Sequence, residues 1–183
     1  MVYNISMIIL TGASASGKTV TALSLQKRYG LVKAITTTTR DMRQGETNGV
    51  EYFFVTKEEF EKRLNENKFV EHSTYNNNYY GCGIDQVSDN KIVVLDPNGL
   101  HSFLKLNNKN IVSFLLIADE NTRHTRMIER GDKKENILER LKNDINDFSL
   151  EKIGKVDFII NTENKTIDEV ADQIYKLYKE KIA

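Results

Sequence analysis

The sequence is poor in cysteine and proline. Of its 183 residues, one is a cysteine, Cys82, and one is a proline, Pro97. A single cysteine excludes an intramolecular disulfide and a metal site built from cysteines. It also fits a reducing compartment. We therefore expect a cytoplasmic protein.

The sequence also lacks an excess of charge of either sign. Its formal net charge is zero, so no overall field draws it to nucleic acid or to anionic lipid. The first ten residues carry no basic segment of the kind that opens a signal peptide. No apolar run approaches the roughly 20 residues that span a bilayer. We expect one globular domain over 1–183, with no nucleic-acid or membrane partner.

Arginine is scarce as well, because lysines outnumber the eight arginines by more than two to one. Where a chain uses lysine by default, an arginine is more informative, because its planar fork of donors suits phosphate binding. The arginines are therefore candidate site residues.

Short apolar runs alternate with helical stretches along the chain. The runs Met7–Leu10, Ile92–Leu95 and Ile111–Ala118 are typical of parallel strands buried on both faces. Helices are expected over Lys18–Tyr29 and after the capping-box sequence that starts at Thr166. This alternation predicts an α/β fold with a parallel sheet flanked by helices.

Two segments interrupt this rhythm. Aromatic, β-prone runs between about residues 37 and 90 predict a small inserted lobe, and charged helices over about 121–149 predict a lid. The core would then comprise about 1–36, 91–120 and 150–183. Other expected strands are Leu31–Thr36, Glu51–Val55, Phe69–His72, Asn78–Gly81 and Val156–Ile160.

The segment Gly12–Thr19, GASASGKT, matches the phosphate-binding P-loop pattern, with an apolar strand before it and a helix after it. Its glycines let backbone N–H groups turn toward an anion, and the helix N-terminus adds partial positive charge. Lys18 can reach the β- and γ-phosphates, and the Thr19 hydroxyl can ligate Mg²⁺. A P-loop alone does not distinguish a kinase from an NTPase or a switch protein.

Arg40, Arg43 and Tyr52 form a candidate clamp for a second phosphate. Each guanidinium offers bidentate donors, and the tyrosine hydroxyl adds a neutral donor. By composition alone, a solvated loop with scattered charge explains this segment equally well.

The segment Thr38–Phe54 resembles the guanylate kinase signature T-[ST]-R-x2-R-x2-E-x2-G-x2-Y-x-F at every fixed position. The resemblance continues through Phe69-Val70-Glu71, Asn78-Tyr79-Tyr80-Gly81, the lid arginines and 156–161, so it covers essentially the whole chain. It implies transfer of phosphate from ATP to GMP, with Mg²⁺ as the metal cofactor.

The resemblance also implies roles for individual residues. ATP would be bound by Gly12, Ala13, Ser14, Ala15, Ser16, Gly17, Lys18, Thr19, Arg126, Arg130 and Asn161. GMP would be bound by Thr36, Arg40, Arg43, Tyr52, Glu71, Tyr80, Cys82 and Arg140. The catalytic residues would be Lys18, Arg40, Asp96, Arg126, Arg130 and Arg140, and the metal ligand Thr19.

Glu71 is implied to recognise the base, and its chemistry agrees. A carboxylate accepts from both N1–H and the 2-amino group of guanine, whereas adenine would leave it unsatisfied. Without the family resemblance, Glu71 would be interpreted as an exposed acid at a strand end. Arg126, Arg130 and Arg140 would be interpreted as surface charges.

The sequence departs from the family at three places. Ala15 replaces a glycine of the loop, and costs about 1 kcal/mol if that position needs a positive φ. Cys82 replaces a serine or threonine near the guanine, and a thiol is a weaker hydrogen-bonding group. Asp96-Pro97-Asn98-Gly99 replaces a longer acidic segment, in which Asp96 keeps the place of the acid near Mg²⁺ and the acceptor phosphate.

We therefore expect a guanylate kinase-like enzyme, a monomer or homodimer, that uses ATP to phosphorylate GMP and dGMP in purine nucleotide metabolism. The alternatives are a ribose 1,5-bisphosphate phosphokinase or another monophosphate kinase, and a catalytically silent guanylate kinase-like interaction module. The intact Arg40–Tyr52 signature and Glu71 argue against the sugar kinase, and Lys18 argues against the silent module.

Overall fold

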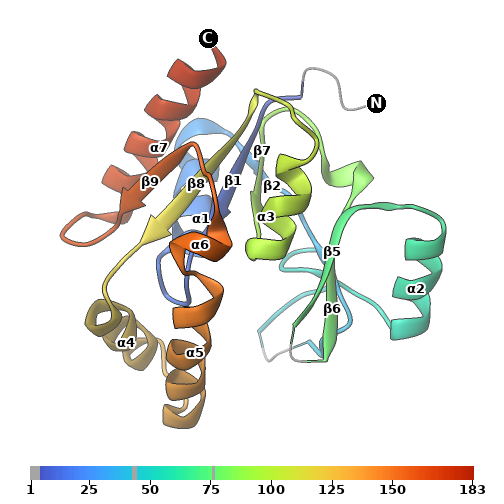
Figure 1. The fold of residues 1–183 in the computed structure, drawn as a ribbon, viewed down its shortest axis with the longest axis horizontal. Coiled ribbons are helices and arrows are strands. Elements are labelled where there is room, and N and C mark those ends of the chain that lie inside the picture. Colours follow the sequence, from blue (N-terminus) through green and yellow to red (C-terminus); the bar gives the residue numbers. More distant parts are fainter. Residues whose placement is uncertain (1–4, 43–44, 76) are drawn as a thin grey trace.

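The larger of two sheets forms the centre of the molecule (Figure 1). The structure is a computed structural model that describes residues 5–42, 45–75 and 77–183. This sheet has five parallel strands in the order β2-β7-β1-β8-β9. They are β1 (Met7–Thr11), β2 (Val32–Lys33), β7 (Lys91–Val94), β8 (Ile111–Ile117) and β9 (Phe158–Asn161).

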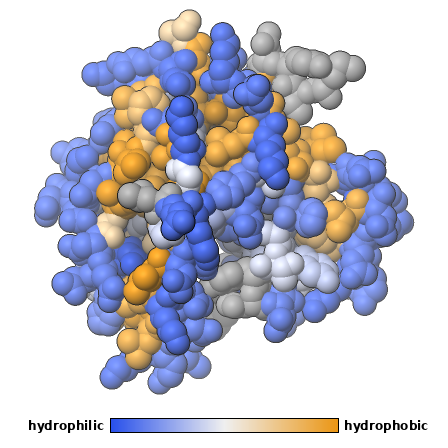
Figure 2. All heavy atoms as spheres, in the orientation of Figure 1, coloured by the Kyte–Doolittle hydropathy of each residue, from blue (hydrophilic) through white to orange (hydrophobic). Residues whose placement is uncertain are grey.

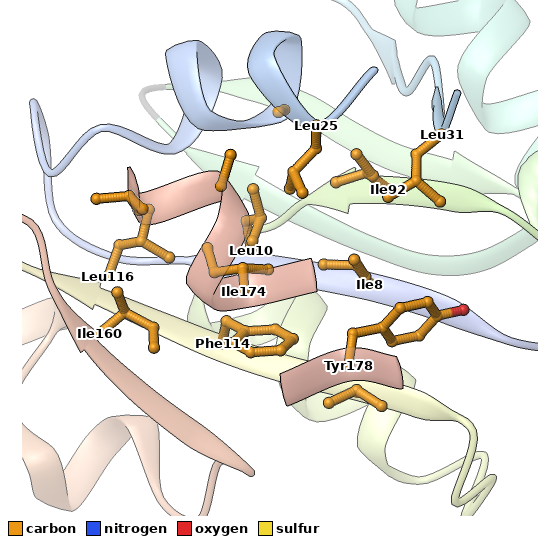
Figure 3. Packing of buried hydrophobic residues seen from close by; sticks show 14 residues of the cluster. Ile8, Leu10, Leu25, Leu31, Ile92, Phe114, Leu116, Ile160, Ile174 and Tyr178 are labelled. Atoms are coloured by element: carbon orange, nitrogen blue, oxygen red, sulfur yellow. The ribbon is translucent and has the colours of Figure 1, made fainter. Parts of the chain in front are cut away.

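Helices cover both faces of this sheet, because successive side chains of a strand point to opposite sides. Ile8 and Leu10 of β1 pack in a cluster with residues of α1 (Lys18–Tyr29) and α7 (Ile167–Ile182), as Figure 3 shows. Met7 and Ile9 belong to a second cluster, with residues of α3 (Pro97–Leu104) and α6 (Leu150–Ile153). The result is a three-layer core.

The smaller sheet belongs to a separate lobe, with strand order β4-β3-β6-β5. Strands β3 and β4 are parallel, and the other two pairs are antiparallel. The ring of Phe60 in α2 stacks on Phe69 of β5, with 4.5 Å between centroids, and so joins the helix to the sheet. The elements are β3 (Thr37–Thr38), β4 (Phe53–Phe54), α2 (Lys57–Asn65), β5 (Phe69–Tyr75), β6 (Asn78–Gly83) and the 3₁₀ turn η1 (Ile84–Gln86).

Helices α4 (Glu120–Glu129) and α5 (Lys134–Asp147) lie across from this lobe (Figure 1). They share a small apolar cluster of Met127, Ile137 and Leu141. Figure 2 shows hydrophilic side chains over most of this face of the molecule. Across the three described ranges, no helix combines the length and apolar character needed to cross a bilayer.

The α/β fold with a parallel sheet flanked by helices is confirmed, and α1 has the expected bounds. Two expected strands are much shorter: the strand in the run 31–36 is Val32–Lys33, and the strand in the run 51–55 is Phe53–Phe54. Helices α3 and α6 were not predicted. Asp96 caps α3 by accepting from the Gly99 N–H, and Pro97 occupies its first turn, which are both recognisable start signals.

Candidate active site

A cleft of about 940 Å³ lies at the carboxyl ends of β1 and β7, between the small lobe and α5. This edge of an open parallel sheet is where α/β proteins bind ligands. Ten of the predicted site residues line the cleft: Gly12, Ser14, Lys18, Thr36, Arg40, Tyr52, Glu71, Tyr80, Asp96 and Arg140.

The phosphate-binding loop joins β1 to α1 through backbone conformations that glycine allows. Gly12 has φ 148°, and a Cβ at this residue would lie 2.3 Å from the carbonyl oxygen of Leu116. Gly17 has φ 104° and is the N-cap of α1. The strand and helix thus converge through a turn that a larger residue at Gly12 would block.

Ala15 adopts a positive φ of 58°. This is the conformation in which alanine was expected to be less favourable than the glycine of the family. A left-handed conformation costs a non-glycine residue about 1 kcal/mol. The Ala15 side chain packs against Met127, Ile137 and Leu141 of α4 and α5. The contact of the Ala15 side chain with α4 and α5 therefore offsets part of the backbone strain at this residue.

Lys18 begins α1 and turns back over the loop. Its Nζ donates to the carbonyl oxygens of Gly12 and Ala13, at 2.5 and 2.9 Å. Burial lowers the pKa of Lys18 to about 8, and the nearby guanidinium groups add to this effect, whereas the Asp144 carboxylate opposes it. The amine is therefore held close to the loop backbone, where a phosphate would bind.

The three lid arginines take different positions. Arg126 donates to the Ala15 carbonyl at 3.2 Å and to the Thr162 hydroxyl and carbonyl, both at 3.0 Å. Arg130 and Arg140 both bind the carboxylate of Asp132. Arg140 lines the cleft, whereas Arg126 and Arg130 do not.

Arg40 lies on the opposite side of the cleft. Its guanidinium forms two hydrogen bonds with the Glu46 carboxylate, at 3.0 and 2.8 Å. The rings of Tyr52 and Phe54 each lie 5.4 Å from it. These contacts fix the orientation of its donors. Arg43, the other predicted clamp arginine, lies outside the described residues.

Glu71 is a buried acid of β5, only 5% exposed. Burial, and then the negative charge of Asp96, raise the pKa of Glu71 to about 8. Gly99 allows this close packing, because a Cβ there would lie 3.0 Å from Glu71 Oε2. The backbone of Cys82, which lies opposite Glu71 across β5 and β6, lowers the pKa of Glu71.

Asp96 follows β7 and connects the two sheets. Its Oδ1 accepts from the Gly99 N–H at 2.8 Å, and its Oδ2 accepts from the Ser73 hydroxyl at 2.6 Å. The acid therefore caps α3 and binds β5 while it lines the cleft. The cap was not expected from the sequence.

The prediction that the Cys82 side chain lies in the guanine site is not met. The thiol is fully buried in the second core cluster and does not line the cleft. Thr19 and Asn161 are exposed and also lie outside the cleft wall, as do Ala13, Ala15, Ser16 and Gly17.

Several cleft residues were missed. Ser73 reaches Asp96, and His101 of α3 is 3.0 Å from the Ile153 carbonyl of α6. Asp144 of α5 binds the phosphate loop. The sequence around Asp144 does not indicate its role, because Asp144 resembles the other acidic residues expected on the surface of this helix. The missed residues are Ser73, Thr74, Asn78, Gly81, Val94, Leu95, Pro97, Asn98, His101, Asn136, Glu139, Asp144, Asp147, Phe148 and Lys152.

The comparisons with known proteins agree with this geometry. The chain is 29% identical to a guanylate kinase of Chlorobaculum tepidum, with 92% of this chain and 91% of the other covered. It is 30% identical to a guanylate kinase of Fusobacterium nucleatum, with 86% and 89% covered. A guanylate kinase structure from Anaplasma phagocytophilum superposes with a TM-score of 0.73 at 24% identity, over 98% of this chain and 88% of that one.

The family model described as guanylate kinase matches residues 4–181. Because this match spans nearly the whole sequence, the chain belongs to the guanylate kinase family of phosphate-transferring enzymes.

Proposed function

We propose that the chain transfers the γ-phosphate of magnesium-bound ATP to the phosphate of GMP or dGMP, giving ADP and GDP or dGDP. The observation that carries this proposal is the buried Glu71 carboxyl, which shares one cleft with Lys18, Arg40 and Arg140. A base-recognising acid and phosphate-binding cations are the two parts that the reaction needs.

Glu71 is the proposed reader of the base. Its ionised carboxylate would accept hydrogen bonds from N1–H and the 2-amino group of guanine. Adenine has an acceptor at N1 and no 2-amino group, so it would leave a buried acceptor unsatisfied. Polar mismatches of this kind discriminate by up to about 10⁴-fold. Recognition by base and phosphate alone also supports the use of dGMP, because neither involves the 2′-hydroxyl.

Arg40, Tyr52 and Tyr80 are the proposed ligands of the GMP phosphate. All three line the cleft, and the Tyr52 and Tyr80 rings lie 6.1 Å apart. In the proposed complex, their donors would bind this phosphate on the side of the cleft opposite the phosphate loop. An acceptor phosphate held there faces the γ-phosphate of ATP.

In the proposed reaction, an oxygen of the GMP phosphate attacks the γ-phosphorus, and the bond to the β–γ bridging oxygen breaks. No protein base is needed, because the attacking phosphate is already anionic. Lys18 and Arg140 would balance the negative charge shared by the three phosphates. Positioning and charge neutralisation therefore account for the catalysis.

The Mg²⁺ ion would enter with ATP as part of the substrate. Thr19, at the second position of α1, has an exposed side chain that suits one metal ligand. Both Asp96 oxygens already accept hydrogen bonds. Over the described residues, no group of three or more acidic, histidine or cysteine side chains could hold a metal. The arrangement is consistent with a Mg²⁺ ion that is bound mainly by the ATP phosphates, with Thr19 as one protein ligand.

A coupled assay of ADP release tests the proposal, with Mg-ATP and a panel of GMP, dGMP, AMP, UMP, dTMP and ribose 1,5-bisphosphate. We expect turnover with GMP and dGMP that is lost in the Glu71→Gln variant. Glu61→Gln, an exposed acid on α2, is the matched control and should keep full activity. Equal turnover of AMP, or activity with the sugar bisphosphate only, would overturn the proposal.

We also propose a role in purine nucleotide metabolism. The expected cytoplasmic location and the monomeric or homodimeric state stay predictions, which cell fractionation and light scattering can check.

A further inference from the structure

A buried ion pair joins the two lid helices. Nη1 of Arg123 in α4 donates to Oδ2 of Asp144 in α5 at 2.8 Å, and the two side chains are 9% and 8% exposed. Neither residue has a role in the proposed reaction. A buried pair of this kind calls for an explanation, because desolvating two charges costs several kcal/mol.

The pair binds the phosphate loop through Ser14. The Ser14 N–H donates to Asp144 Oδ2 at 3.0 Å, and its hydroxyl donates to Oδ1 at 3.3 Å. The Ser14 carbonyl accepts from Arg123 Nη1 at 3.4 Å. Every polar group of Ser14 is therefore bonded to the Arg123–Asp144 pair.

Ser14 directly precedes Ala15, whose backbone has the strained φ of 58°. The Ala15 carbonyl in turn accepts from Arg126. Polar contacts from α4 and α5 thus hold both residues at the centre of the loop. A strained conformation persists only where the surroundings specify it.

Packing alone does not require this pair, because apolar side chains of similar size fill such a site at equal or lower cost. What an apolar pair cannot supply is the set of hydrogen bonds to Ser14. We propose that Asp144, oriented by Arg123, is a positioning residue of the donor site, which holds the first half of the phosphate loop in its ATP-binding conformation.

Asp144 also acts on Lys18 through its charge. Burial and the charges of Arg123, Arg130 and Arg140 favour the neutral amine, and the Asp144 carboxylate favours the charged one. Loss of the carboxylate would therefore lower the pKa of Lys18 further. ATP binding needs the protonated Lys18 amine. In a variant without the Asp144 carboxylate, ATP affinity would therefore begin to fall at a lower pH than in the wild-type chain.

The test uses the full chain and measures ATP affinity by calorimetry, together with kcat/KM for ATP. Asp144→Asn keeps the shape of the side chain and removes its charge. We expect ATP affinity to fall at least about tenfold, the effect of losing one charged hydrogen bond. The KM for GMP at saturating ATP should stay within about twofold, because the acceptor side is untouched.

A double variant separates positioning from stability. Arg123→Met with Asp144→Leu replaces the pair by apolar side chains, so its melting temperature should stay close to that of the wild type. We expect its ATP affinity to remain low. Recovery of both stability and ATP affinity would show that the pair only fills space, and would overturn the proposal.

Two further readouts sharpen the result. In Asp144→Asn, the loss of ATP affinity with rising pH should begin at lower pH than in the wild type, and an unchanged pH profile would contradict the electrostatic part. Glu129→Gln removes an exposed acid of α4 that is outside the cleft wall, and should bind ATP normally.

This inference rests on the use of ATP in the proposed function, and the two can fail separately. If the wild-type chain binds ATP without phosphorylating GMP, the proposed function is wrong while the Asp144 variants still test the positioning role. If GMP is phosphorylated and the variants bind ATP normally, only the positioning role is wrong.

Discussion

Cys82 lies directly opposite Glu71 in the antiparallel pair of β5 and β6. The register shifts between Phe69 and Glu71, so a bulge lies immediately before the acid. Bulges re-aim side chains next to functional sites. Burial and the negative charge of Asp96 raise the pKa of Glu71, and the backbone of Cys82 opposes this shift.

The first prediction concerns the pH dependence of GMP use. With a pKa of about 8, Glu71 is mainly protonated at pH 6 in the free protein, and guanine needs the ionised form. At saturating ATP, kcat/KM for GMP should therefore rise between pH 6 and pH 8. The measurement is a series of initial rates at limiting GMP. A fall in kcat/KM across this range would contradict the assignment of Glu71.

The second prediction concerns stability. Glu71 has a higher pKa in the folded chain than its usual 4.5, so the folded state binds an extra proton between pH 4.5 and about 8. Its stabilising contribution is fully present below pH 4.5 and is lost as pH rises toward 8.

Glu71→Gln should remove this dependence. Urea unfolding at pH 5 and pH 8 would show that the wild type loses more stability than the variant, by at least about 1 kcal/mol. Glu61→Gln should behave like the wild type. Equal losses in wild type and Glu71→Gln would show that Glu71 is ionised already at pH 5.

The third prediction concerns Gly12. A Cβ at this residue would lie 2.3 Å from the Leu116 carbonyl and 2.7 Å from the Ser16 hydroxyl. Gly12→Ala should therefore cost about 2 kcal/mol or more in unfolding free energy and abolish ATP binding. Chemical denaturation and calorimetry measure both effects. Gly131→Ala is the control, because a Cβ at Gly131 meets no atom within 4 Å. The control therefore measures the cost of a positive φ without a steric clash.

The fourth prediction concerns the Cys82 thiol. It is fully buried, and burial together with the charges of Glu71 and Asp85 raises its pKa. Thiolate is the reactive form, so Cys82 should resist a thiol reagent in the native protein and react once the chain is unfolded. Labelling followed by mass spectrometry checks this. Rapid labelling of the native chain would show that the second core cluster opens readily.

Local features of the fold could be predicted because the interactions behind them are local. The glycines of 12–17 allow the turn between strand and helix, and the capping box at Thr166 satisfies backbone groups within one helical turn. Buried strands such as Ile111–Ile117 can be predicted equally well, because their side chains are apolar on both faces of the sheet. Helix α3 was not predicted, although Asp96 and Pro97 at its start are residue types that often begin a helix.

The site depended on contacts between distant segments. Asp144 and Ser14 are 130 residues apart, and nothing near Asp144 in the sequence distinguishes it from other helix-surface acids. The burial of Cys82 was likewise set by packing between the two sheets.

The phosphate loop, helix α1 and the buried strands β1 and β8 were therefore determined by the sequence itself, because backbone sterics and hydrophobic periodicity act over a few residues. Tertiary structure alone decided the pKa shifts of Glu71 and Lys18 and the hydrogen bonds that join Ser14 to Arg123 and Asp144. Desolvation and ion pairing depend on which distant groups surround a charge, and folding brings those groups together.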